Sequence, residues 1–411
     1  MQKKLIALAV AGLASTAAFA QTNVTIYGSV DYGYSYRFDA RGLDSLTNLR
    51  NNSANKPGSS SQFNGGQLNG NRLGFKGTED LGNGLKAVFL FEQGWLGDTG
   101  AAASSTSFYN RQAYMGLSGN FGTVVGGRLY TPHYTFVSGL DPFGAGTVGQ
   151  YRNVYSPGGG INGTLLGVGG VSGDNLMDPV RVNNALAYMS PSWGGFQVTA
   201  AFSNDAFGQD SNNNNAQNNT VYAVLGQYTG GIFTVGANYH YIAGGTAPNA
   251  GAVISGPLYA QTSGRLDSVQ NFTLGGSVDF KVAKVMALYS WNELDISAPN
   301  VGNATVNNYM LGATFPIGKH EILGSYIYSD GNRQAGGDAQ QLALGYKYNL
   351  SKRTSLYSAY SWIDNSSKRL NGVGDATTSG AYAAQGTPGS LTYQDAGAWQ
   401  QGFQVGVRHW F

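Results

Sequence analysis

The amino-acid sequence predicts an all-β protein, a transmembrane antiparallel β-barrel of about 16 strands. Three observations lead to this prediction. Glycine makes up 62 of 411 residues and aromatic residues 12 %, whereas charged residues are only 11 %, which favours strands and turns over helices or disorder. Many segments alternate apolar and polar residues with a period of two. Short and long connections also alternate along the chain.

The first 20 residues have the three parts of an export signal. Lys3 and Lys4 give a positive start, residues 5–13 are apolar, and residues 18–20 form a small-x-small cleavage pattern. We therefore expect residues 1–20 to be removed and residues 21–411 to form one exported domain. Without Lys3 and Lys4 the basic and acidic residues are equal in number, which excludes the basic excess of a nucleic-acid-binding protein.

The alternation places strands along the whole mature chain. One example is Phe233, Val235 and Ala237, which alternate with Thr234 and Gly236, as in a strand with one apolar and one polar face. The expected strands lie near residues 23–38, 71–80, 84–96, 108–119, 121–130, 182–190, 195–204, 220–229, 231–242, 269–280, 282–293, 305–316, 318–330, 338–350, 353–364 and 401–411.

A soluble β-sandwich would also alternate, but other features favour a barrel in a membrane. The segments commonly reach about ten residues, longer than the roughly five or six of soluble strands, and aromatic residues gather towards their ends, as in an interfacial girdle. Backbone groups in lipid must all be paired, so the sheet has to close. Short turns such as 82–84 on one side and long polar connections on the other are typical of an outer-membrane barrel. The long connections are residues 39–70, 131–181, 205–219, 243–268 and 365–400.

Charged residues on the strands are the candidates for function. An arginine that faces the bilayer midplane costs about 2–4 kcal/mol, so each should face the lumen, an interface or a protein contact. Arg72 and Lys76 fall opposite Leu73 and Phe75, and on the next strand Lys86 and Glu92 fall opposite the apolar side. The same strands could instead carry independent solvated charges. Glycine-rich surroundings leave the face unclear for Arg111 and Arg128.

Nothing in the sequence supports catalysis or a bound metal. The four histidines are far apart, the chain has no cysteine, and the carboxylates are scattered. We therefore expect neither an enzyme nor a cofactor.

The chain resembles the general-diffusion porins of Gram-negative bacteria, of the Burkholderia and Neisseria type. The stretches that carry the resemblance are "NVTIYGSVDYGY", "NRLGFKGTEDLGNGLKAVFLFEQG", "NRQAYMGLSGNFGTVVGGR", "RVNNALAYMSPSWGGFQV" and "GVRHWF", and they occur in family order over nearly the whole mature chain. The resemblance implies a homotrimer of sixteen-stranded barrels in the outer membrane, surrounded by lipid and lipopolysaccharide. It also implies one water-filled pore in each subunit, open to ions and small hydrophilic solutes.

The family resemblance also implies how the pore is narrowed. The third extracellular loop, here residues 131–181 with Asp141, Pro142 and Phe143, would fold inward and face basic residues on the wall. Asp141 is the candidate acid on the loop side. By motif position, the residues that fit the basic wall are Arg72, Arg111 and Arg128, with Arg181 and Lys86 as further candidates. Because the loop is poor in acids, a weak anion preference is expected.

The terminal stretch is expected to close the barrel. Phe403, Val405, Val407, His409 and Phe411 would face lipid, and the strand would pair with the one that starts near Asn23. In the family, a terminal aromatic residue such as Phe411 is also read by the barrel assembly machinery.

Two other functions are compatible with the sequence. The barrel could be a substrate-specific channel for sugars or aromatic acids, which would need an aromatic track along the lumen. It could also be a plugged surface barrel that acts as an adhesin through its long loops.

Overall fold

The computed structural model describes residues 23–39, 60–104, 107–155, 177–207, 219–243, 253–256, 259–263, 265–297, 302–366, 369, 371–374 and 399–411. The expected signal peptide, residues 1–20, lies outside these residues. So do several segments of the long connections, including residues 156–176 of the expected inward loop.

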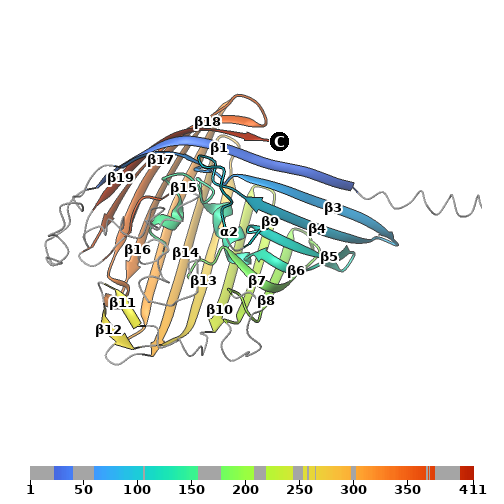
Figure 1. The fold of residues 1–411 in the computed structure, drawn as a ribbon, viewed down its shortest axis with the longest axis horizontal. Helices are drawn as coiled ribbons and strands as arrows, with labels where there is room; N and C mark the ends of the chain where they lie inside the picture. The colour runs from blue at the N-terminus through green and yellow to red at the C-terminus, as the bar shows by residue number, and fades with distance from the viewer. Residues whose placement is uncertain are drawn as a thin grey trace, which may run out of the picture.

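Sixteen of the described strands form a closed antiparallel barrel (Figure 1). From β3 onwards, each barrel strand pairs with the next barrel strand along the chain. β1 closes the ring by pairing with both β3 and β19. All sixteen strands expected from the alternation are confirmed, with ends that shift by a few residues. The barrel strands are β1 (Asn23–Asp39), β3 (Arg72–Gly82), β4 (Leu85–Gly94), β5 (Gln112–Gly119), β6 (Gly122–Tyr130), β7 (Arg181–Met189), β8 (Phe196–Ser203), β9 (Val221–Gly230), β10 (Phe233–Ala243), β13 (Arg265–Asp279), β14 (Lys284–Ser297), β15 (Ala304–Ile317), β16 (His320–Gly331), β17 (Ala339–Asn349), β18 (Thr354–Asn365) and β19 (Gln400–Trp410).

The seam between β1 and β19 has the expected pairing and faces. The register runs from Ser29 opposite Trp410 to Asp39 opposite Gln400. Beyond it, the Phe411 amide donates to the Gly28 carbonyl at 3.2 Å. Along β19 the lipid-facing Phe403 and Val405 are 42 % and 39 % exposed, whereas Gln404 between them is fully buried inside the barrel. Apolar side chains therefore cover the outer wall.

Three short strands were not predicted. β2 (Ser60–Gly65) pairs with the Tyr32–Arg37 half of β1, and β11 (Val253–Gly256) pairs with β12 (Tyr259–Ser263) in a separate hairpin. These segments hold four to six residues, too few to show a clear alternation. Between β2 and β3 the chain makes an inward turn, residues 66–71.

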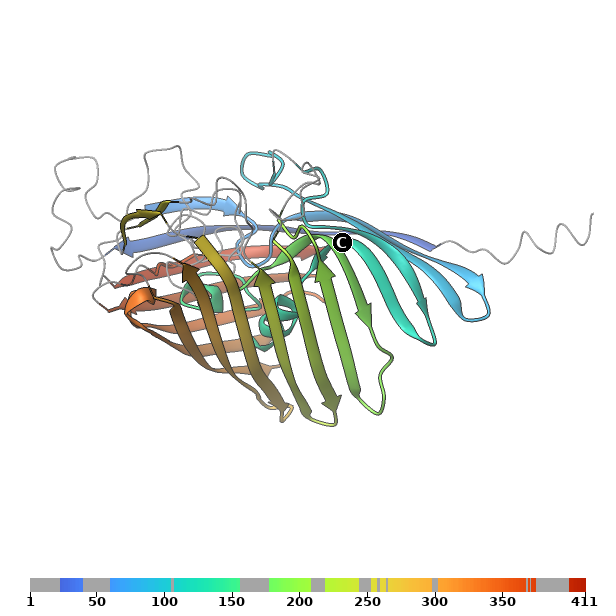
Figure 2. The same cartoon turned by 90° about the horizontal axis from the view of Figure 1, so that it is seen from below.

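The connection between β6 and β7 enters the barrel. It contains α2 (Pro132–Leu140) and the short 3₁₀-helix η2 (Tyr151–Asn153). The side chain of Thr131 caps α2 by accepting a hydrogen bond from the Tyr134 amide at 3.0 Å. Seen from below, the helix lies inside the curve of the wall (Figure 2), where it contacts β8, β9, β10, β13 and β14.

An apolar cluster attaches the described part of this connection, residues 131–155 and 177–180, to the far wall. We call this part the constriction loop. Phe136, Leu140 and Phe143 from the loop share a buried cluster with Leu288 and Leu323 of the wall. The loop therefore leaves open the side of the lumen next to β3–β7. No helix among the described residues is long and apolar enough to cross a membrane.

Candidate pore constriction

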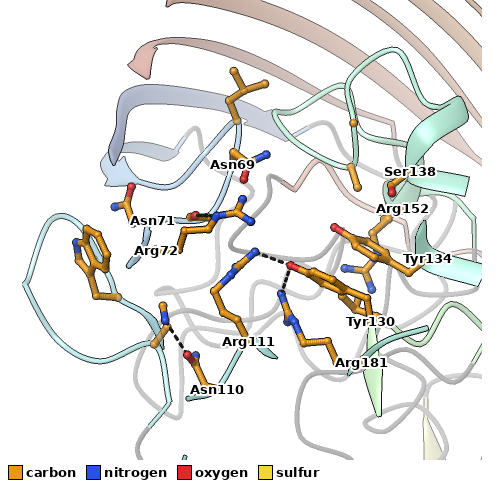
Figure 3. Close-up of a pocket in the computed structure, with 18 of the residues that line it drawn as sticks. Asn69, Asn71, Arg72, Asn110, Arg111, Tyr130, Tyr134, Ser138, Arg152 and Arg181 are labelled. Atoms are coloured by element: carbon orange, nitrogen blue, oxygen red, sulfur yellow. Dashed lines mark hydrogen bonds between the residues drawn. The ribbon is translucent and has the colours of Figure 1, made fainter. Parts of the chain in front are cut away.

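A cavity of about 440 Å³ lies between the constriction loop and the wall (Figure 3). The barrel side contributes Arg72 from β3, Arg111 just before β5 and Arg181 at the start of β7. The three residues lie on one part of the wall, from β3 to β7. Their guanidinium groups therefore line one side of the cavity.

Glu92 of β4 partly balances these charges. Its carboxylate accepts a hydrogen bond from Arg111 Nε at 2.6 Å and lies 3.6 Å from Arg72 Nη1. The Tyr27 hydroxyl donates to the same carboxylate at 3.0 Å. Glu92 is only 2 % exposed, so both oxygens are used inside the cluster. Three arginines against one carboxylate leave the wall of the cavity net positive.

Tyr130, at the end of β6, joins two of the arginines. Its hydroxyl accepts hydrogen bonds from Arg111 Nη2 at 2.7 Å and Arg181 Nη2 at 3.1 Å. The Arg181 guanidinium also lies 4.7 Å from the centre of the Tyr130 ring, a distance at which a cation is attracted to an aromatic face. Tyr134 of α2 stacks on the ring, with centroids 5.2 Å apart. Tyr130 therefore positions the guanidinium groups of both Arg111 and Arg181.

The loop side of the cavity carries hydroxyl groups and one further arginine. Tyr134, Thr135, Ser138 and Arg152 line it, and no carboxylate does so in the part of the chain that the structure describes. Arg152 Nε donates to the buried Asp178 carboxylate at 2.6 Å. Burial raises the pKa of Asp178, but Arg152 and then His133 outweigh it and hold that pKa below its usual range. Asp178 is therefore a partner of Arg152 behind the cavity surface.

Asp141 lies away from the cavity. It is 5 % exposed, and its carboxylate accepts the backbone N–H groups of Phe143, Ala145 and Tyr151 at 3.1, 2.9 and 3.1 Å. Burial raises its pKa to about 6, although these three N–H groups oppose the shift. Asp141 thus closes a turn within the loop.

Pro142 and Phe143 also lie outside the lining of the cavity. They pack against wall glycines: a Cβ at Gly312 would meet Pro142 at 2.5 Å, and one at Gly345 would meet Phe143 at 2.6 Å. Only a residue without a side chain allows this close approach. Asp141, Pro142 and Phe143 together seat the loop on the wall.

Two expected wall residues are also separate from the cavity. Arg128 donates to the Asn110 carbonyl at 2.8 Å and to the Asn183 side chain, and so supports Asn110, which does line the cavity. Lys86 is exposed near the β3–β4 turn, opposite Asp80 in the register. The structure therefore brings together Arg72, Arg111, Arg181 and Glu92.

Sequence reasoning missed three parts of the site. Tyr130 is one of many tyrosines near strand ends, so its sequence position did not mark it. Arg152 lies in a connection without the period-two alternation that assigns a strand residue to one face. The inward turn 66–71 was also missed. Its Leu68 and Asn69 amides donate to the Asp31 carboxylate, both at 2.7 Å, and it lines the cavity from Leu68 to Asn71. The sequence signal that could have found this turn is Asp31, because an acidic residue on a barrel strand needs hydrogen-bond donors.

Comparison with known proteins identifies the family. A family model described as "Gram-negative porin" matches residues 7–368. "Outer membrane porin protein 32" of Delftia acidovorans is 33 % identical, with 100 % of each chain covered. "Major outer membrane protein P.IB" of Neisseria gonorrhoeae is 25 % identical over 88 % of this chain and 94 % of the relative.

The comparison of structures agrees with the comparison of sequences. The solved structure of the "Anion-selective porin from Comamonas acidovorans" superposes with a TM-score of 0.69 at 26 % identity, covering 95 % of this chain and 100 % of that one. The fold, the sequence and the polar cavity beside the constriction loop agree. The chain belongs to the Gram-negative porin family and is a channel of the outer membrane, not an enzyme.

Proposed function

We propose that this porin is weakly anion-preferring and that the preference arises at the cavity beside Arg72, Arg111 and Arg181. The observation that carries the proposal is the unbalanced charge of that cavity. Glu92 is the one carboxylate bound into the cluster of described residues, and both its oxygens are engaged by Arg111, Arg72 and Tyr27. Positive charge in a narrow, low-dielectric channel raises the local concentration of anions.

The mechanism is passive and uses no cofactor. The arginines attract anions, the constriction loop sets the size cutoff, and polar wall groups replace part of the hydration shell of a passing solute. The structurally similar porin from Comamonas acidovorans is described as anion-selective, which supports the same preference here.

The assembly of the channel is also proposed. We expect a homotrimer in contact with outer-membrane lipid and lipopolysaccharide, made from residues 21–411 after removal of residues 1–20. The whole inward loop would span residues 131–181, and Phe411 would be read by the barrel assembly machinery. The membership in the porin family supports each of these expectations.

A planar-bilayer experiment tests the proposed function. Purified protein should give conductance steps, and its reversal potential in a KCl gradient should show a preference for chloride. Arg111→Ser should lower that preference, whereas Lys86→Ser should leave it nearly unchanged, because Lys86 lies outside the cavity. A cation-selective reversal potential in the wild type would overturn the proposed preference.

A further inference from the structure

The hydrogen bonds of the Tyr130 hydroxyl leave its proton without an acceptor. A phenol has one O–H donor and two lone pairs, and a guanidinium has donors only. Arg111 and Arg181 both donate to this oxygen, at 2.7 and 3.1 Å, so they occupy both lone pairs. The O–H bond must therefore point to a third group.

The described residues offer no such group. The nearby Glu92 carboxylate accepts from Arg111 and Tyr27 and lies near Arg72, but it makes no hydrogen bond with Tyr130. No acceptor for the Tyr130 proton is found elsewhere in the described chain. Tyr130 lines the cavity, with its hydroxyl between the two guanidinium groups (Figure 3). The proton is therefore available to whatever occupies the space between Arg111 and Arg181.

We propose that Tyr130 is a specificity-determining residue whose hydroxyl donates a hydrogen bond to an anion held by Arg111 and Arg181. This inference rests on the proposed anion preference and adds a chemical class to it. Carboxylates and other small oxyanions that accept hydrogen bonds strongly gain from the third donor. A weakly accepting anion of the same charge, such as perchlorate, gains little. The constriction therefore selects among anions by hydrogen bonding as well as by charge.

The structure provides a clean variant and a matched control. Tyr130→Phe removes the hydroxyl and keeps the ring, which Tyr134 and the Arg181 guanidinium hold on its faces at 5.2 and 4.7 Å. Tyr134→Phe removes a second hydroxyl from the same cavity. Among the described contacts, that hydroxyl accepts a hydrogen bond from neither Arg111 nor Arg181.

The experiment measures reversal potentials in bilayers with formate or perchlorate as the replacing anion. In the wild type, the formate-to-perchlorate permeability ratio should exceed the ratio of their mobilities in free solution. Tyr130→Phe should lower the ratio by about two- to tenfold, the effect of one hydrogen bond, and Tyr134→Phe should keep it near the wild-type value.

Three results would overturn the inference. One is a wild-type ratio equal to the free-solution ratio, which needs no variant to fold. Another is an unchanged ratio in Tyr130→Phe. The third is an equal loss of both permeabilities in that variant, which would make Tyr130 only a support for the arginines. A wild type without chloride preference in KCl would instead remove the proposed function, so the two failures are distinguishable.

Discussion

At the scale of single residues, the charge of the constriction depends on Glu92. This carboxylate binds Arg111 and lies near Arg72 while almost fully buried. Glu92 was expected to be lumenal from its position opposite an apolar face, and Arg72 likewise because Leu73 and Phe75 mark the other face. Arg152 could not be expected, because it lies in a connection without period-two markers.

Glu92→Gln should strengthen the anion preference. The amide keeps the shape and one acceptor oxygen but removes one negative charge beside the cavity. Loss of a unit charge about 10 Å away in water favours chloride and disfavours potassium by about 0.4 kcal/mol each, so the chloride-to-potassium permeability ratio should rise about fourfold. Reversal potentials in a KCl gradient measure this ratio, and Glu79→Gln is the control because Glu79 lies near the β3–β4 turn, outside the cavity. An unchanged ratio would place Glu92 outside the path of the ions.

Asp141 should affect the noise of the open-channel current rather than the ion selectivity of the pore. Asp141→Ala removes the acceptor of three backbone N–H groups in the constriction loop, and each unsatisfied buried donor costs about 1–3 kcal/mol. Open-channel current noise should rise while the reversal potential stays the same. A shift towards anion selectivity would instead support a role for Asp141 as the acid facing the pore.

At the scale of elements, the constriction loop is clamped by a second inward segment, residues 369 and 371–374. Arg369 is 1 % exposed and donates to the Val154 carbonyl of the loop at 3.2 Å, to the Ser329 hydroxyl of β16 at 2.7 Å and to the Gly337 carbonyl at 3.0 Å. Asn371 adds a bond to the Asn153 carbonyl at 2.7 Å. One side chain thus ties together three separate parts of the chain.

Arg369→Leu should loosen the constriction loop. Buried carbonyls would lose their donors, and hydrogen bonds to a charged group contribute about 1.5–3 kcal/mol each. Single-channel recordings should show added subconductance states, while the temperature of barrel unfolding should change little because the strand ladder is intact. Arg333→Leu is the control, because Arg333 is exposed on the β16–β17 connection. If Arg369→Leu showed no added subconductance states, the apolar cluster alone would be enough to hold the constriction loop in place.

Sequence patterns predict the elements unevenly. Barrel strands were found because one face meets lipid and the other water, which imposes a period of two on every strand. β2, the β11–β12 hairpin and α2 lack that constraint, since they do not separate two solvents. The inward turn 66–71 depends on Asp31, which lies 35 or more positions earlier in the chain, and no local pattern records such a contact.

At the scale of the whole molecule, closure of the barrel depends on the end of β19. A Cβ at Gly28 would meet the Phe411 ring at 2.3 Å, so the ring lies directly on β1. Phe411 and Gly28 also exchange two backbone hydrogen bonds, at 3.1 and 3.2 Å. The terminal aromatic residue is therefore part of the seam.

Deletion of Phe411 should reduce the yield of folded barrels. It removes both hydrogen bonds and the ring, and it also removes the proposed recognition signal. The fraction that resists unfolding on unheated electrophoresis should fall several-fold, whereas the conductance of channels that do insert should match the wild type. Phe411→Tyr keeps the ring and the backbone and should fold normally. An equal yield for the deletion would contradict both roles of Phe411.

The contact between Gly28 and Phe411 also joins the first barrel strand to the last one. The two residues are neighbours in space but are separated by almost the whole described chain. Until β19 arrives, β1 and β18 are unpaired edges, which are costly in lipid. A chain that lacks β19 therefore cannot close the wall of the pore. Products of synthesis that end before β19 would therefore form no closed channel and no leak.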